Sequence, residues 1–122
     1  LNTSHTDSKE LIKSIIDGIQ DKKGRKITHI DLMEMNPQLP EFIICEGSST
    51  TQVSAIADNV REHLLQTSNI KPYNYDGYQN SKWIVIDYGD TLVHIFLPSE
   101  RQHYNLEELW SDAPVSEIPD LD

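Results

Sequence analysis

The sequence contains a single cysteine, Cys45, so no disulfide can form within the 122-residue chain. Long hydrophobic runs are missing as well, because no apolar stretch approaches the roughly 20 residues that a helix needs to cross a bilayer. Cys45 stands inside an apolar segment, where we interpret it as a small buried side chain rather than a nucleophile. These absences together predict a protein of a reducing, cytoplasmic compartment.

Basic residues are scarce. Ten Lys and Arg against twenty Asp and Glu give a net charge of −10 at pH 7. Six of the ten basic residues lie within residues 1–26, so residues 27–122 carry four basic and sixteen acidic residues, a net charge of −12. This charge disfavours direct binding to nucleic acid, because affinity for a phosphate backbone depends on cationic side chains. An acidic body suits a basic protein partner, and it equally serves solubility.

Motifs of the common catalytic and metal sites are also absent. The five histidines show no HExxH spacing and Cys45 has no second thiol near it, so nothing favours a zinc site. The pattern GxSxG is missing, and the turn at residues 47–50 has neither the lysine nor the spacing of a P-loop. We interpret this turn as the N-cap of a helix. His94, inside an apolar strand, is interpreted as a core or interface residue rather than a general base.

One enzymatic alternative stays open, namely a small nucleotide- or metal-binding enzyme that uses the Gly47 turn with the carboxylates of Asp87 and Asp90. Two carboxylates that flank a turn could bind a divalent ion. In an extended chain, however, a spacing of three residues places them on opposite faces unless the turn folds them together. The spacing therefore weakens this alternative.

The residues that are present, 37% hydrophobic and 25% charged, have the composition of one folded domain. The first residues are too polar for a secretory signal, and we expect residues 1–7 to be a remnant or a frayed terminus. From Ser111 onward acidic residues and prolines dominate, so we expect residues 111–122 to form a loosely packed acidic tail. The folded domain should then span residues 8–110.

Hydrophobic periodicity predicts the main elements of this domain. Apolar residues at helical spacing predict one helix that begins at Asp7 or Ser8 and ends near Asp21, and a second helix that carries Val53 to Leu64. Apolar runs predict strands at residues 27–33 and 42–45. A short third strand within residues 72–77 and a helical patch at residues 106–110 complete the prediction.

Residues 81–104 carry the strongest pattern in the chain. Residues 83–86 and 92–97 are rich in β-branched and aromatic side chains, and Gly89 between them can supply the positive φ of a tight turn. The pattern predicts a β-hairpin. Because both runs are apolar at nearly every position, we expect strands covered on both faces by helices, as in an α/β domain.

Several of these segments, in their order and spacing, resemble the ribosomal silencing factors of the Iojap-like family. The resemblance covers roughly Leu11 to Trp110. It rests on Gly-Ser-Ser at residues 47–49, Ile-Ala-Asp at 56–58, Gly77 before Asn80 and Ser81, Trp-Ile-Val-Ile-Asp-Tyr-Gly-Asp at 83–90, Val-His-Ile-Phe at 93–96 and Glu-Glu-Leu-Trp at 107–110.

The resemblance implies an α/β fold with a mixed sheet of about five strands flanked by helices, similar in outline to nucleotidyltransferases but without their chemistry. Such an enzyme would pair a Gly-Ser turn with two carboxylates one residue apart on a strand. Here Asp87 and Asp90 stand three residues apart, and Asp31 has no acidic partner at position 33. We therefore expect a protein that is not an enzyme and needs no cofactor.

The function that the resemblance implies is binding to the large ribosomal subunit through its ribosomal protein fourteen (uL14). The bound factor would block association with the small subunit and so repress translation, with little direct contact to nucleic acid. A second alternative is an acidic adaptor for another basic protein. The resemblance also allows for a homodimer.

The partner-binding residues that the resemblance implies are four aromatic residues, Trp83, Tyr88, Phe96 and Tyr104, with Asp87, Asp90, Glu100 and Arg101 as polar companions. Large aromatic residues ringed by charges are typical anchors of protein interfaces. Strand periodicity could instead bury Trp83 and Phe96 in the core. We expect Tyr88 to be presented at the turn, where we would expect a smaller aliphatic residue in many relatives. The proline-bearing loop at residues 36–40 is a second departure, which could alter local contacts.

Overall fold

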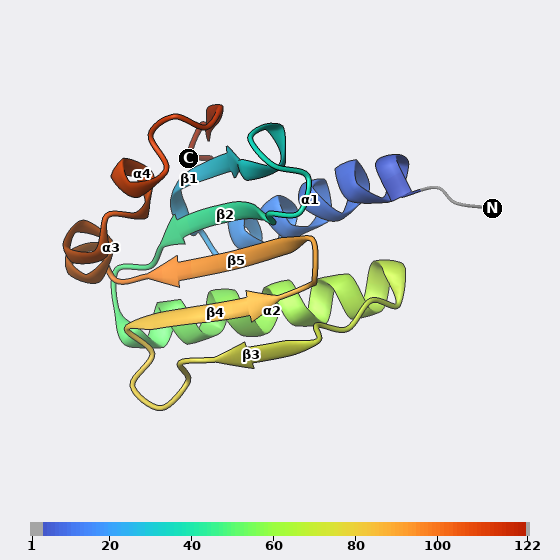
Figure 1. Cartoon of the computed structure of the whole chain (residues 1–122). Coiled ribbons are helices and arrows are strands. Elements are labelled where there is room, and N and C mark those ends of the chain that lie inside the picture. Colours follow the sequence, from blue (N-terminus) through green and yellow to red (C-terminus); the bar gives the residue numbers. More distant parts are fainter. Residues whose placement is uncertain (1–3, 122) are drawn as a thin grey trace.

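A computed structural model, which describes residues 4–121, contains one mixed sheet of six strands in the order β3-β4-β5-β2-β1-β6 (Figure 1). Strands β2 and β5 run parallel, and every other neighbouring pair is antiparallel. The predicted α/β fold is confirmed, with six strands in place of about five. The strands are β1 (Arg25–Asp31), β2 (Glu41–Glu46), β3 (Asn74–Asp76), β4 (Trp83–Asp87), β5 (Thr91–Phe96) and β6 (Val115–Ile118).

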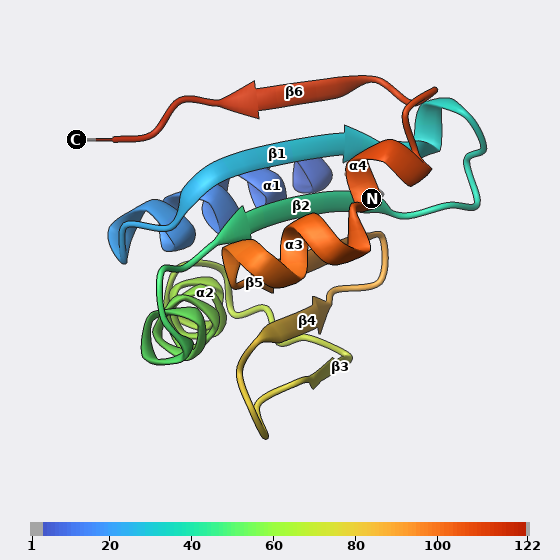
Figure 2. The same cartoon turned by 90° about the vertical axis from the view of Figure 1, so that its left-hand side faces the viewer.

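Two long helices, α1 (Ser4–Asp21) and α2 (Thr50–Ser68), lie side by side on one face of the sheet (Figures 1 and 2). Their apolar stripes pack against the inward residues of the strands and form the main core. It includes Ile15 and Ile19 of α1, Ile56 and Val60 of α2, and Ile43, Ile84, Ile86 and Ile95 of the strands. The hydroxyl of Ser49 accepts a hydrogen bond from the Gln52 amide at 3.1 Å, which confirms the predicted N-cap. No helix among the described residues is long and apolar enough to cross a membrane.

Helix α1 begins at Ser4, before the predicted start at Asp7 or Ser8. Of the predicted remnant at residues 1–7, residues 1–3 lie outside the described residues, and residues 4–7 belong to the helix. The polar composition of this segment hid the first turn, because a helix start carries no apolar periodicity of its own.

The opposite face of the sheet carries two short helices, α3 (Pro98–Tyr104) and α4 (Leu106–Leu109), at one end (Figure 1). A second cluster of buried side chains lies there, made of Ile30, Leu32, Phe42, Ile44, Phe96 and Ala113. The expectation that helices cover both faces of the hairpin is wrong for β4. Helices of seven and four residues are too short to span the sheet, so this face of β4 stays half-buried.

The ends of β1 differ from the prediction in two ways. The strand ends at Asp31, and Leu32 and Met33, which were predicted as strand, belong to the 3₁₀ turn Leu32–Glu34. Near its start a bulge between Arg25 and Thr28 places Lys26 in the left-handed region with a φ of 53°. A bulge adds an unpaired residue, which redirects the backbone groups beside it.

The prediction of a loosely packed tail at residues 111–122 is wrong for residues 115–118. They form β6, which pairs with β1 in antiparallel register from Ile27 opposite Ile118 to Ile30 opposite Val115. Most of its side chains are exposed, so the segment lacks the apolar alternation from which a strand is predicted. Backbone pairing with β1 holds it in place, and of its four side chains Ile118 packs against the main core.

Strand β3, predicted within residues 72–77, is the edge strand on the side of the sheet opposite β6. The Tyr75 amide donates to the Asn74 side chain at 2.9 Å, and the Gly77 amide donates to the Asp76 carboxylate at 2.8 Å. Gly77 has a φ of 105°, and an added Cβ would stand 2.1 Å from the Trp83 carbonyl oxygen. Only glycine fits this link between β3 and β4 without strain.

Candidate docking face

The sheet face turned away from α1 and α2 is apolar and only partly covered. Period-two alternation sends Ile84 and Ile86 to the helices, whereas Trp83 and Val85 remain on the open side. Across the hairpin Trp83 lies opposite Phe96, and Val85 lies opposite His94. Because β5 also pairs with β2, these side chains continue into Phe42 and Ile44 on the same face.

Aromatic rings gather on this side, and we refer to Phe42, Trp83, His94, Phe96, Tyr104 and Trp110 as the aromatic face. The Trp83 ring stacks on Phe96 with centroids 4.9 Å apart, and Tyr104 of α3 contacts Trp83 at 4.5 Å. The His94 and Phe42 rings meet edge to face at 4.6 Å, and Phe42 meets Trp110 at 6.5 Å. The short helices thus complete a cluster that the strands begin.

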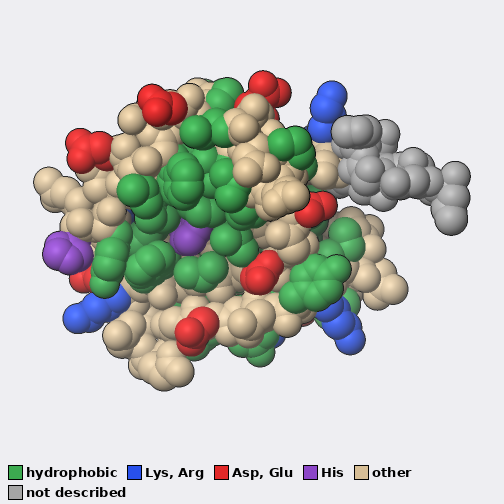
Figure 3. Space-filling model, in the orientation of Figure 1, with side chains coloured by type: hydrophobic (Ala, Val, Ile, Leu, Met, Phe, Trp, Pro, Cys, Tyr) green, Lys and Arg blue, Asp and Glu red, His purple; other side chains and the backbone are tan. Residues whose placement is uncertain are grey.

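Part of this cluster is accessible. Tyr104 is 47% exposed, Leu109 of α4 is also exposed, and Trp83 is half-buried. Hydrophobic side chains form a broad patch over the near face in Figure 3, and acidic side chains border it. A contiguous exposed apolar patch of this kind marks an interaction surface more often than a passive one.

The acidic residues predicted for the site lie at two places. Asp87 and Asp90 flank the hairpin turn, where the Asp87 carboxylate accepts a hydrogen bond from the Gly89 amide at 2.7 Å. Asp90 is exposed, and Glu100 is half-buried on α3. Trp83 stands at the other end of β4 from Asp87, roughly 13 Å away at the usual rise of a strand. The turn and the aromatic cluster are therefore two ends of one surface.

Tyr88 is not presented at the turn. It continues the alternation of Ile84 and Ile86, so its side chain enters the core under α2 and is only 7% exposed. Burial raises the pKa of Tyr88 to about 12, and its hydroxyl has no hydrogen-bond partner among the described residues. The expectation of an exposed Tyr88 is wrong because the strand pattern extends one residue into the turn.

Strand periodicity left open whether Phe96 and Trp83 belong to the core or to an interface, and the two residues differ in burial. Phe96 is 1% exposed and belongs to the second buried cluster, whereas Trp83 packs against that cluster and stays half-buried. Trp83 and Tyr104 are thus the predicted aromatic residues that solvent can reach.

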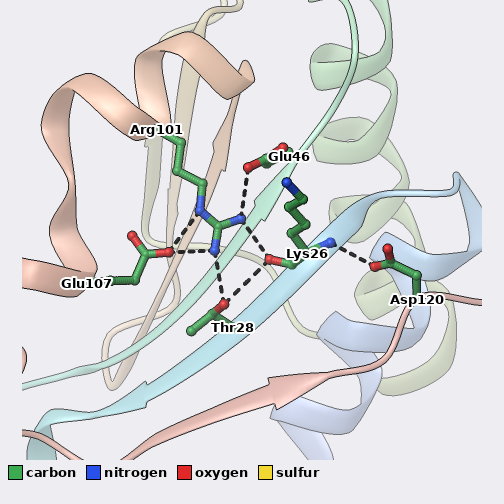
Figure 4. A network of polar contacts seen from close by, with 6 residues as sticks. All are labelled: Lys26, Thr28, Glu46, Arg101, Glu107 and Asp120. Carbon is green, nitrogen blue, oxygen red and sulfur yellow. Dashed lines mark hydrogen bonds and ion pairs between the residues drawn. The ribbon is translucent and has the colours of Figure 1, made fainter.

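Arg101 is engaged within the protein (Figure 4). Its Nε and Nη2 both donate to Oε2 of Glu107, and Nη2 also donates to the Thr28 hydroxyl at 2.9 Å. Nη1 donates to the Lys26 carbonyl at 2.7 Å and to the Glu46 carboxylate at 3.4 Å. The side chain is 11% exposed, so it does not present its charge to solvent.

His94 occupies the middle of the aromatic face as a neutral ring. Trp83 Nε1 donates to its Nδ1 at 3.1 Å, and burial lowers the pKa of His94 to about 4. The core or interface interpretation of His94 fits this placement. Sequence reasoning missed its bond to Trp83, although the antiparallel register of a hairpin brings Trp83 and His94 close enough for side-chain contact.

The Gly47 turn and the Asp87 carboxylate, which had suggested an enzyme, make hydrogen bonds within the protein. Ser48 donates from its amide to the Gln52 side chain at 2.6 Å, so the Gly47 turn serves as a helix cap. Among residues 4–121, no group of three His, Cys, Asp or Glu side chains is arranged to hold a metal ion. The carboxylate of Asp87 is turned toward the backbone of its own turn.

A family model described as "Ribosomal silencing factor during starvation" matches residues 5–122. The chain is 35% identical to "Ribosomal silencing factor RsfS" of Halalkalibacterium halodurans over 111 residues, which cover 91% of this chain and 94% of that protein. A crystal structure of protein CV0518 from Chromobacterium violaceum superimposes with a TM-score of 0.79 at 30% identity, covering 84% of this chain and 85% of the other.

Two relatives from eukaryotes are similar over part of their length. "Protein Iojap, chloroplastic" of Zea mays is 40% identical over 78 residues, which are 64% of this chain and 33% of that protein. "Mitochondrial assembly of ribosomal large subunit protein 1" of Mus musculus is 27% identical over 111 residues, covering 88% of this chain and 48% of that protein.

Proposed function

Because this chain belongs to the family of ribosomal silencing factors, we propose that it binds the large ribosomal subunit through ribosomal protein fourteen and blocks association with the small subunit. Translation would be repressed by obstruction alone. The names of the relatives describe a regulatory factor rather than an enzyme. The name of the mouse relative refers to the large subunit, which supports this choice of subunit.

The observation that carries the proposal is the aromatic face. It combines buried rings with the partly accessible rings of Trp83 and Tyr104. The carboxylates of Asp87 and Asp90 stand at the hairpin turn, and Glu100 stands on α3. Interfaces draw most of their binding energy from such aromatic anchors, whereas charged rim residues mainly guide association and register. Tyr88, Phe96 and Arg101 would support this surface from inside rather than touch the partner.

The charge of the domain favours a protein over RNA as the surface that is contacted. Residues 27–122 carry a net charge of −12, which ribosomal RNA repels and a basic ribosomal protein attracts. Arg101, which stands on α3 three residues before Tyr104, is paired with Glu46 and Glu107, whereas Lys82, which directly precedes Trp83, is exposed. The surface is apolar in its centre and belongs to a domain with a large excess of acidic residues, which complements a basic protein.

Cosedimentation with isolated large subunits, followed by a pull-down with purified ribosomal protein fourteen, tests the proposal. Tyr104→Ala removes an exposed ring and should weaken both interactions at least tenfold, the size of a moderate hot spot. Tyr75→Ala is the matched control, because Tyr75 is 44% exposed but its ring contacts Arg61 of α2. Its binding should stay within about twofold of the unchanged protein.

Two results would count against the proposal. Equal losses from Tyr104→Ala and Tyr75→Ala would show that the aromatic face has no special part in binding. Retention of large subunits without retention of ribosomal protein fourteen would assign another basic protein of the subunit as the partner.

The rate at which the two ribosomal subunits associate gives a functional readout. Added protein should lower this rate, and the Tyr104→Ala variant should lower it much less.

A further inference from the structure

We propose that Arg101 is a positioning residue, which fixes α3 on the sheet and thereby holds Tyr104 in place on the aromatic face. This inference rests on the proposed function, since it concerns the surface that would meet the partner. It differs from the sequence expectation, in which Arg101 would contact the partner itself.

The donors of Arg101 are fully occupied. A guanidinium carries five N–H groups in a rigid fork, and Arg101 makes five hydrogen bonds, to Glu107, Thr28, Lys26 and Glu46 (Figure 4). The acceptors come from α4, β1 and β2, so one side chain ties α3 to three other elements. No N–H group is left for a partner's acceptor.

The bulge in β1 prepares the acceptor at Lys26. With Lys26 in the left-handed region, its carbonyl accepts from Arg101, while its amide donates to the Asp120 carboxylate at 2.8 Å. In a regular strand the amide and the carbonyl of this residue would both form hydrogen bonds with a neighbouring strand. The bulge thus joins α3 and the segment after β6 to one point of the sheet.

Helix α3 depends on this attachment. It has seven residues, and none of them is buried. A helix this short is not stable by itself in water, so tertiary contacts must hold it. Two of its inward contacts are the bonds of Arg101 and the ring of Tyr104, which stand three residues apart and so on one side of the helix.

The two possible roles of Arg101, a clamp that fixes α3 on the sheet or a direct contact to the partner, make opposite predictions for substitution of Glu107. If Arg101 is a clamp, Glu107→Ala removes its main anion and should loosen α3, which weakens binding. If Arg101 contacts the partner, the same change frees the guanidinium and should leave binding equal or stronger. Glu108→Ala is the matched control, because Glu108 is the exposed neighbour on α4 and its loss changes the net charge equally.

The experiment measures the affinity of the full chain for isolated large subunits. Arg101→Met and Glu107→Ala should each weaken it about tenfold, and the double variant should lose no more than the larger single loss, because the two residues act as a unit. Arg101→Lys, which keeps the charge but not the fork, should lie between. Additive losses, or unchanged binding with Glu107→Ala, would overturn the clamp.

Hydrogen exchange on the free protein supplies a readout that needs no partner. In Arg101→Met and Glu107→Ala the amides of residues 101–105 should exchange at least about tenfold faster, while those in the middle of α2 stay unchanged. Unchanged exchange at α3 would overturn the clamp even if binding fell. If the unchanged protein does not bind large subunits, the proposed function fails, and the exchange result still decides the role of Arg101.

Discussion

Trp83 fixes the protonation state of His94. The indole Nε1 can only donate, and it donates to Nδ1 of His94 at 3.1 Å across the β4–β5 pair. Nδ1 is therefore unprotonated, and the proton of the neutral ring sits on Nε2. Protonation of His94 would place a second donor against the indole, so the centre of the aromatic face requires a neutral ring.

This relationship makes stability depend on pH. Burial lowers the pKa of His94 from 6.5 to about 4, so the unfolded chain binds more protons than the folded one between these values. The contribution of His94 is complete above pH 6.5 and declines as the pH falls towards 4, by about 3 kcal/mol in total. Urea unfolding at pH 7.5 and pH 5 should show a loss of about 2 kcal/mol from this residue.

The control is His94→Asn, which offers an acceptor to Trp83 but does not titrate. Carboxylates contribute equally to both proteins, so the difference between their pH dependences isolates His94. Parallel curves for the two proteins would refute the assignment of a low pKa to this histidine.

Tyr88→Phe should leave the protein as stable as before or stabilise it by up to about 1 kcal/mol. The change removes a buried hydroxyl that has no hydrogen-bond partner among residues 4–121, and such a group carries a desolvation cost. Tyr88→Glu should instead unfold the domain, since it buries an unpaired carboxylate beneath α2. Thermal unfolding by circular dichroism measures both, and a folded Tyr88→Glu variant would disprove the burial.

Gly77→Ala should destabilise the domain more than Gly89→Ala does. Both glycines have positive φ, 105° and 91°, so each substitution costs about 1–2 kcal/mol in backbone strain. At Gly77 the new Cβ also meets the Trp83 carbonyl oxygen at 2.1 Å, whereas at Gly89 it meets the movable ring of Tyr73 at 2.8 Å. Urea midpoints of the two variants give the comparison, and equal shifts would count against the backbone clash.

Salt should slow binding to the large subunit. A domain with twelve excess negative charges in residues 27–122 would be steered towards a basic protein, and added ions screen such steering beyond about 10 Å at 0.1 M. Raising the salt from 0.05 M to 0.5 M should lower the association rate constant about tenfold and change the dissociation rate constant much less. A rate constant for association that is independent of salt would argue for an uncharged target.

The sequence was sufficient where a long periodic pattern met a single environment. The stripe from Leu11 to Ile19, the helix from Val53 to Leu64 and the hairpin at residues 83–97 are all present, because one buried face dictates their spacing. The resemblance to the ribosomal silencing factors is likewise confirmed. Within the candidate site, Trp83 and Tyr104 were predicted and do lie together.

Two of the remaining errors have a common physical origin, namely contacts that depend on residues distant in the sequence. Strand β6 is held by the backbone of β1, more than 80 residues earlier, so its own side chains show no pattern. Arg101 reads as a free surface charge until the fold brings Thr28 and Glu46 to it. Tyr88 differs, because counting the alternation one residue past β4 would have placed it in the core.

Two hydrogen bonds between backbone amides and neighbouring side chains along β3 limit how this protein can associate with others. The outermost strand of a sheet normally offers free amides on which a second chain can add a strand. Here the amides of Tyr75 and Gly77 are already taken by Asn74 and Asp76. A protein that keeps an apolar surface open for a partner risks polymerisation, and by occupying these donors β3 discourages strand addition at this edge while leaving the aromatic face free.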